Sequence, residues 1–318
     1  MAKLPTIICP GCGKEVISEQ FTPNARGGAH HARNYHNCLR RCAPCGFGFS
    51  NSNTDKINQL TIIYRNPFWN LPAFVAKGHE LALERAINIA NRLSKREKFA
   101  SSQSEDHVTW TVFRYLQINS GLRSIMAKIG VDFASLSISE PTLLLWGVPV
   151  ANDDTVGKSV YCKLEAISDA IGEDPTRRSE PDVILDFGGS GLVLIEVKVK
   201  SPNDTKKGDY EGWAKYISST EAFTDPEKAK SSGLYELVRN WRIGCDMAVG
   251  RPVVLINLGF SKLFDNDCRV PLQNFRESLR QDPMRRFHEV TWEVFLGTIS
   301  NKPEWFNRYL QERGLVRL

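Results

Sequence analysis

The stretch that decides the fold reads Pro181-Asp182-Val183-Ile184-Leu185-Asp186-Phe187-Gly188-Gly189-Ser190-Gly191-Leu192-Val193-Leu194-Ile195-Glu196-Val197-Lys198. Residues 181–187 and 191–199 are rich in β-branched and apolar side chains, which predicts two strands. The Gly-Gly-Ser segment between them predicts an antiparallel hairpin with a short turn. Because side chains alternate across a strand, Glu196 and Lys198 share one face of the second strand.

The length of this turn fixes which residues lie opposite each other. With a three-residue turn at 188–190, counting outward along both strands places Asp182 opposite Glu196. Opposed side chains have Cβ atoms roughly 4.5–5.5 Å apart, so the two carboxylates repel unless a cation lies between them. Lys198 follows on the same face, and the carbonyl of Val197 is a further candidate metal ligand. The sequence therefore predicts a metal site, and the alternative is a salt-bridged surface hairpin.

A bound divalent cation in such a site can polarise a phosphate and lower the pKa of its water, while a lysine orients that water. Pro181-Asp182, thirteen intervening residues and Glu196-Val197-Lys198 resemble the motif of the PD-(D/E)XK nuclease superfamily. The resemblance implies that Asp182 and Glu196 bind Mg²⁺ or Mn²⁺ and that Lys198 assists the attacking water. This family often adds an acidic residue on the helix before the sheet, for which Glu105 is the best match and Asp106 the second.

The rest of the chain predicts the elements around this hairpin. We expect a helix starting at 104, a strand at 142–150, a polar loop at 200–232, a helix at 233–247, a buried strand at 252–258 and a helical remainder that includes Arg285 and Arg286. This order agrees with the resemblance, which implies a restriction-endonuclease-like α/β fold, with a mixed central sheet flanked by helices, over 101–318. Residues 56–100 are expected to form a strand, then a linking helix over 76–98.

A separate module is predicted at the N-terminus, over 1–55. It contains Cys9-Pro10-Gly11-Cys12-Gly13 and Cys42-Ala43-Pro44-Cys45-Gly46, two matched knuckles with 29 residues between Cys12 and Cys42. Thiolates three residues apart can grip one Zn²⁺, and the glycine after each pair permits the tight turn. The pattern is typical of a four-cysteine zinc ribbon. Cys38, near His30, His31 and His36, is interpreted as a bystander, although it could replace one ligand.

The charge distribution is consistent with a nucleic-acid partner. The net charge is +5, and residues 1–56 hold seven basic and three acidic residues, a balance of 7 − 3 = +4. Concentrated positive charge can neutralise phosphates, although a solvated basic surface is the alternative. Phe47 and Phe49 are candidates for stacking on bases. The candidate nucleic-acid contacts are Arg40, Arg41, Arg177, Arg178 and Lys200.

Several function classes find no support in the sequence. No apolar stretch approaches the roughly 20 residues of a membrane span, and neither a P-loop nor a nucleophile elbow occurs. We expect a cytoplasmic, Mg²⁺-dependent deoxyribonuclease, acting as a homodimer or with a partner protein. The resemblance implies restriction or antiphage defence, with repair or junction resolution as the nearest alternative. A non-catalytic DNA-binding subunit and an RNA substrate stay open.

Overall fold

The computed structural model describes residues 1–22, 34–51, 61–72, 75, 93–150, 155–175, 178, 180–207, 210–265 and 268–316. The chain divides into two compact units, one comprising Met1–Glu80 with Ile87–Thr111 and the other Leu81–Ala86 with Val112–Leu318. Most of the helix expected over 76–98 lies outside the described residues, and its end forms α3, Leu93–Phe99. Helix α4, Glu105–Ile118, contributes residues to both units.

The first unit is built from short antiparallel strands. Strands β1 (Ile7–Ile8) and β2 (Glu15–Val16) form a hairpin, and β3 (Arg40–Cys42), β4 (Phe47–Phe49) and β5 (Ile62–Tyr64) form a three-stranded sheet. Two 3-10 helices, η1 (Tyr35–Asn37) and η2 (Pro67–Asn70), join this framework. Its small core consists of Ile7, Cys9, Val16, Cys42 and Phe49. Two of these residues, Cys9 and Cys42, are predicted metal ligands.

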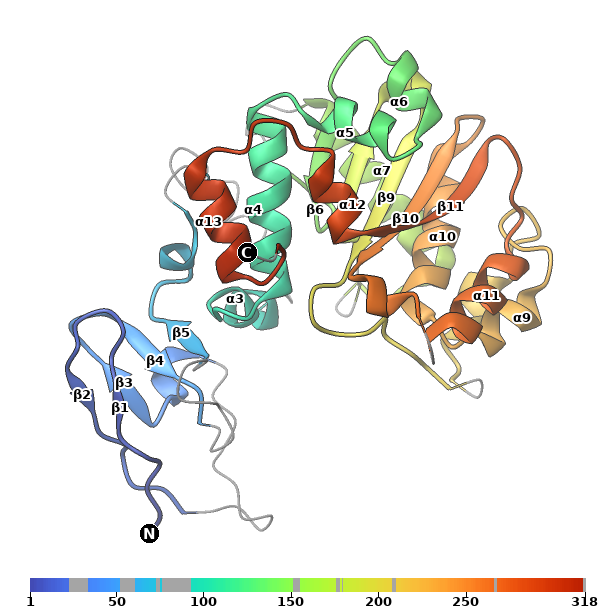
Figure 1. Cartoon of the computed structure of the whole chain (residues 1–318). Helices are drawn as coiled ribbons and strands as arrows, with labels where there is room; N and C mark the ends of the chain where they lie inside the picture. Colours follow the sequence, from blue (N-terminus) through green and yellow to red (C-terminus); the bar gives the residue numbers. More distant parts are fainter. Residues whose placement is uncertain are drawn as a thin grey trace. The chain divides into compact units, whose positions relative to one another are not determined.

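The second unit contains a six-stranded mixed sheet in the order β11-β10-β9-β8-β6-β7 (Figure 1). Strands β9, β10 and β11 are parallel, whereas β8 and β6 run antiparallel to their neighbours. The strands are β6 (Thr142–Leu145), β7 (Val148–Pro149), β8 (Val183–Asp186), β9 (Leu192–Val197), β10 (Val253–Gly259) and β11 (Arg285–Thr291). This sheet confirms the expected mixed α/β class.

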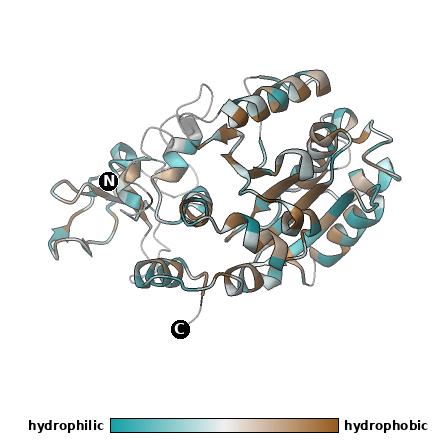
Figure 2. Cartoon of the chain, turned by 90° about the horizontal axis from the view of Figure 1, so that it is seen from above, coloured by the Kyte–Doolittle hydropathy of each residue, from teal (hydrophilic) through white to brown (hydrophobic). Residues whose placement is uncertain are grey.

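Helices flank the sheet. Helices α7 (Thr155–Ile171) and α10 (Tyr235–Ala248) lie behind the sheet in Figure 1, and α12 (Trp292–Gly297) lies in front. Leu192 and Leu194 of β9 pack with Leu237 and Trp241 of α10 in one buried cluster. The apolar central strands stand out in Figure 2. The other helices among the described residues of this unit are α5 (Leu122–Lys128), α6 (Asp132–Leu136), α8 (Trp213–Ile217), α9 (Pro226–Ser231), α11 (Arg269–Ser278) and α13 (Glu304–Glu312), with 3-10 turns η3 (Gly188–Ser190) and η4 (Ser261–Leu263).

Several sequence predictions for this unit were wrong. The expected helical remainder includes β11, which begins at Arg285 and pairs in parallel with β10. The expected strand over 142–150 is two strands, because Trp146 and Gly147 adopt φ values of +51° and +75° and turn the chain back. The polar stretch 200–232 contains α8 and α9, and helix α7 was not predicted.

Candidate functional site

The β8–β9 hairpin has the register predicted from its three-residue turn. The amide of Phe187 donates to the carbonyl of Gly191 at 2.9 Å, and the paired residues are Asp186 with Leu192, Leu185 with Val193, Ile184 with Leu194 and Val183 with Ile195. The next position outward on each strand is occupied by Asp182 and Glu196. Oδ2 of Asp182 accepts a hydrogen bond from the amide of Val197 at 2.9 Å. This bond holds the Asp182 carboxylate beside the end of β9.

Glu196 lies at the buried end of this carboxylate pair. The residue is 3 % exposed, and its Oε2 accepts a hydrogen bond from Nδ2 of Asn240 at 2.8 Å. Burial, followed by the negative charge of Asp182, raises the pKa of Glu196 to about 8. The two acids therefore interact unfavourably when both are ionised, which is the electrostatic condition that favours a bound cation.

Lys198 lies between two carboxylates. Its Nζ is 2.8 Å from Oε1 of Glu196 and 2.5 Å from Oε2 of Glu236, the second residue of α10. Burial opposes the charged ammonium, but the charges of Glu196, Glu236 and Asp182 outweigh it and raise the pKa of Lys198 above its usual range. Lys198 therefore stays cationic at neutral pH and supplies the positive charge beside Glu196.

Helix α10 contributes two side chains that sequence reasoning missed. Glu236 binds Lys198, and Asn240, which is fully buried one turn later, binds Glu196. Residues four apart on a helix point to the same side, so the pair faces the end of β9 together. That spacing is present in the sequence, but it does not reveal which face of α10 meets the sheet.

Asn257 of β10 is a third missed residue. It is the register partner of Glu196 on the neighbouring parallel strand and is fully buried. Its Oδ1 and Nδ2 have no hydrogen-bond partner among the described residues. A buried amide without partners is costly, so such a residue is usually kept for a reason other than packing. The apolar character of 252–258 concealed it in the sequence.

Glu105, the predicted acid on the preceding helix, is the first residue of α4 and belongs to the first unit. Its carbonyl accepts a hydrogen bond from Oγ1 of Thr109 at 3.0 Å, and the neighbouring Asp106 pairs with Lys95 at 2.8 Å. Asp182 and Glu196 belong to the second unit. A metal-binding role for Glu105 thus stays a prediction.

The basic residues near the hairpin differ in their surroundings. Arg178 is largely buried and pairs with Asp169 at 2.5 Å and Glu165 at 3.4 Å on α7. These pairs attach the chain before β8 to α7, so Arg178 has a structural role and is not proposed as a phosphate contact. Lys200 is exposed, and Arg177 lies outside the described residues.

Two of the predicted contacts in the first unit are also structural. The guanidinium of Arg40 is buried and donates to the carbonyls of Pro5 at 3.2 Å and Ser50 at 2.5 Å. Phe49 is fully buried in the small core. Neither side chain can reach a nucleic acid, and both predictions were wrong. Arg41 is partly exposed and pairs with Glu19.

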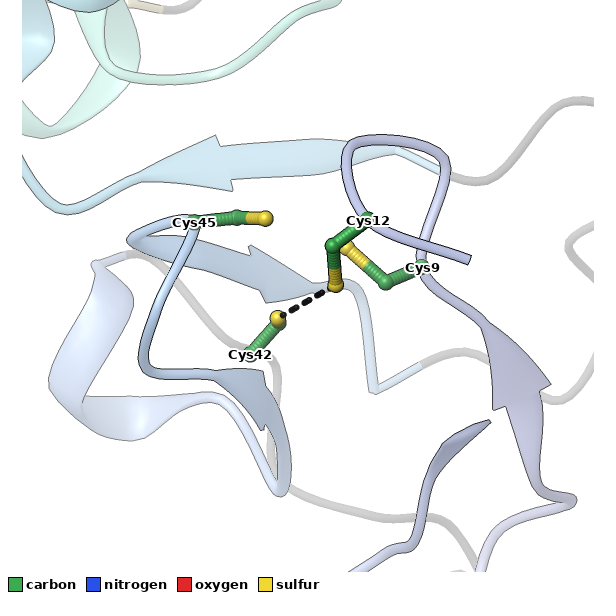
Figure 3. A group of neighbouring side chains, drawn as sticks. All are labelled: Cys9, Cys12, Cys42 and Cys45. Atoms are coloured by element: carbon green, nitrogen blue, oxygen red, sulfur yellow. Dashed lines mark hydrogen bonds between the residues drawn. The ribbon is translucent and has the colours of Figure 1, made fainter. Parts of the chain in front are cut away.

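Four cysteines meet at the tips of two hairpins in the first unit (Figure 3). The sulfur atoms of Cys9, Cys12, Cys42 and Cys45 all lie within 4.8 Å of one another, and those of Cys12 and Cys42 are 3.6 Å apart. In the described part of the chain, no other set of three or more His, Cys, Asp or Glu side chains is as close. This cluster could bind a metal such as zinc.

The knuckle geometry agrees with the sequence prediction. The glycines that follow the two cysteine pairs, Gly13 and Gly46, adopt φ values of +69° and +65°, which glycine tolerates best. A hydrogen bond from the backbone of Lys14 lowers the pKa of Cys12 to about 7. Cys38 lies outside the cluster, where burial raises its pKa to about 12, as expected for a bystander.

Lone cysteines in or beside apolar stretches are predicted to be core residues, and the second unit has three of them, Cys162, Cys245 and Cys268. Cys245 and Cys268 are partly buried against the main cluster, but Cys162 is exposed on α7, so that prediction was wrong for it.

None of the described helices is both long enough and apolar enough to cross a membrane. Comparison with protein-family models, curated proteins and solved structures gives no match.

Proposed function

We propose that this protein is a metal-dependent nuclease of the PD-(D/E)XK type that hydrolyses phosphodiester bonds in DNA. The observation that carries the proposal is the hairpin register, which puts Asp182 in the position opposite Glu196, with Lys198 2.8 Å from Glu196. Two acids and an amine at the end of a sheet strand are the groups that metal-assisted phosphodiester hydrolysis requires. Asp182 is only half-buried, which leaves an approach for substrate.

The donor set fits a hard divalent cation. Mg²⁺ and Mn²⁺ prefer carboxylate oxygens, and the unfavourable pairing of Asp182 with Glu196 is relieved by a cation. When bound, the metal supplies the charge that polarises a phosphate and acidifies water. Asp182 and Glu196 would hold it, Asn240 fixes the orientation of Glu196, and Lys198 orients water and stabilises developing negative charge.

We also propose that the cysteine cluster binds Zn²⁺ as a structural ion. The four sulfurs supply all the ligands that a four-coordinate zinc ion needs, which is typical of structural sites. The resemblance further suggests a role in restriction or antiphage defence. We also propose a cytoplasmic location, and a homodimer or partner protein that would supply the second active site needed to cut both DNA strands.

A plasmid-nicking assay tests the nuclease proposal. Zinc-loaded protein should convert supercoiled plasmid to nicked or linear forms when Mg²⁺ or Mn²⁺ is added. Asp182→Asn and Lys198→Met should each lower the rate at least 100-fold, because each removes a group that acts on the phosphate or its water. Glu312→Gln, an exposed change on α13, is the matched control and should leave the rate unchanged. Plasmid that stays intact with both metals would favour a non-catalytic DNA-binding subunit.

A further inference from the structure

The segment that follows β9 lies beside the Lys198–Glu236 pair. The backbone amide of Asp204 donates to Oε2 of Glu236 at 3.3 Å, the same oxygen that contacts Lys198. The amide of Lys206 donates to the carbonyl of Gly233 at 2.9 Å. These two bonds fix the segment along the start of α10, so the side chains it displays are neighbours of the candidate site.

This segment carries an aromatic cluster. Three rings make edge contacts with Tyr235, at centroid distances of 5.2 Å for Tyr210, 5.5 Å for Trp213 and 5.4 Å for Tyr216. Trp213 and Tyr216 are each 2 % exposed, whereas Tyr210 is 42 % exposed. The two buried rings explain how the cluster is stabilised, but burial does not account for the exposed ring of Tyr210.

The backbone around Tyr210 is adapted to its ring. A Cβ atom at Gly212 would lie 2.3 Å from Cε1 of Tyr210, so a side chain there would displace the ring. Tyr235, which contacts Tyr210, directly precedes Glu236, the partner of Lys198. Tyr210 is therefore an exposed ring that packs against Tyr235. Tyr235 and its neighbour Glu236 connect this ring to Lys198.

Two lysines lie near the same ring in the chain, Lys206 and Lys207. The Nζ atom of Lys206 lies 5.9 Å from the centroid of Tyr210 and 3.5 Å from Oδ2 of Asp204. Lys207 is exposed, and its ammonium makes no ion pair with a residue that the structure describes. Between 199 and 216 the sequence has four lysines and three acids, a balance of 4 − 3 = +1. An exposed aromatic ring beside lysines is the combination that binds single-stranded nucleic acid by base stacking and phosphate contact.

We propose that Tyr210, with Lys206 and Lys207, forms a stacking subsite for an unpaired base of the nucleic acid that enters the site at Asp182, Glu196 and Lys198. The inference rests on the proposed nuclease function and adds the substrate class, a nucleic acid with a single-stranded stretch. Bases in an intact duplex are stacked on one another and present no free face to Tyr210. The subsite should therefore favour a single strand over a duplex of equal length.

Fluorescence anisotropy on the zinc-loaded full chain tests this subsite, with a labelled oligothymidine and a duplex of equal length, and no added Mg²⁺ or Mn²⁺. Tyr210→Ala should weaken single-strand binding about tenfold, since stacking contributes roughly 1–3 kcal/mol per base. Tyr210→Phe keeps the ring and should bind like the wild type. Lys207→Ala should reduce the slope of log K against log salt concentration by about 0.7. Lys163→Ala, an exposed change on α7, is the control and should alter neither value.

The outcomes separate this inference from the nuclease proposal, because binding is measured without cleavage. Tyr210-dependent binding by a protein that cuts no substrate supports the subsite and counts against the enzyme. Cleavage of DNA by a protein whose single-strand affinity is unchanged in Tyr210→Ala overturns the subsite alone. Equal losses for single strand and duplex in Tyr210→Ala would also overturn it, as would an absence of oligothymidine binding by the wild type.

Discussion

At a pH above about 8, where Glu196 is ionised, replacing Asp182 by asparagine should stabilise the metal-free protein. The wild type holds Asp182 opposite a buried Glu196 whose pKa is raised in part by the charge of Asp182. Two unit charges about 5 Å apart at an effective dielectric constant of about 20 repel by roughly 3 kcal/mol. Solvent around the half-buried Asp182 and the nearby Lys198 reduce this value, so we expect a gain of about 1 kcal/mol. The asparagine Oδ1 can still accept the hydrogen bond from Val197.

The equivalent replacement of Asp186, four residues along the chain, should destabilise the protein. Oδ1 of Asp186 accepts hydrogen bonds from Nη1 of Arg251 at 2.8 Å and from the amide of Gly188 at 2.7 Å. Asp186→Asn removes the negative partner of Arg251 and should cost about 1–3 kcal/mol. This matched pair separates an effect of the acidic site from a general effect of removing an aspartate from this hairpin.

Thermal unfolding of the second unit measures both changes. For a unit of this size, about 1 kcal/mol corresponds to roughly 2–4 °C in Tm. Addition of Mn²⁺ at about 100 times its Kd should further stabilise the wild type by about 2.7 kcal/mol and should have little effect on Asp182→Asn. A lower Tm for metal-free Asp182→Asn, or an undiminished response to Mn²⁺, would refute a repulsive carboxylate pair that holds a metal.

Three further predictions concern other groups. The pKa of Glu196 is raised in the folded state, so the folded protein keeps a proton on Glu196 that the unfolded chain has already lost. The stability of the metal-free protein should therefore fall as the pH rises toward about 8, and Glu196→Gln should make Tm less dependent on pH. Cys42→Ser should release zinc to a chromogenic chelator at concentrations where Cys38→Ser retains it, since only Cys42 belongs to the cluster. Asn257→Leu should raise the free energy of unfolding, measured with urea, by about 1 kcal/mol, because it removes an unpartnered buried amide, and should slow plasmid nicking.

The hairpin could be predicted from the sequence because its determinants are local. The turn at Gly188–Ser190 and the alternating strands fix the register within eighteen residues, 181–198. The knuckles are local for the same reason, as each consists of two cysteines and a glycine at a tight turn. In both cases chain connectivity alone limits where the side chains can lie.

Glu236, Asn240 and Asn257 could not be predicted because tertiary packing places them. Glu236 meets Lys198 across 38 residues, and Asn240 meets Glu196 across 44. Their roles depend on how α10 rotates over the sheet, which the buried contacts of Leu237 and Trp241 decide. A sequence pattern shows that α10 has an apolar face, but not which polar residues at its margin meet the end of β9.

Strand β11 was missed because it does not show the alternation expected of a strand. It lies at the edge of the sheet, and only Phe287 and Val290 are buried, three residues apart, a spacing that also suits a helix. Arg285 and Arg286 at its start form ion pairs with Asp282 and Asp132, so their charge indicated nothing about the sheet. Pairing with β10 overrides the weak local preference of this segment.

Charge balance gives Glu236 a role beyond its contact with Lys198. The carboxylates Asp182, Glu196 and Glu236 face the cations Lys198 and Arg239, so the ionised cluster carries 2 − 3 = −1. A divalent cation changes this to +1, and one phosphodiester charge then neutralises it. Glu236→Gln makes the metal-free cluster neutral, so we expect Mn²⁺ to bind about tenfold more weakly, a change of about 1.4 kcal/mol.

Titration of the variant with Mn²⁺, followed by electron paramagnetic resonance of the free ion, measures this loss. Glu227→Gln is the matched control, because Glu227 lies in the first turn of α9 and is exposed. If Glu236 acts only by positioning Lys198, the Mn²⁺ affinity of Glu236→Gln should equal that of Glu227→Gln while nicking slows. That result would show that Glu236 only positions Lys198 and that its charge does not contribute to metal binding.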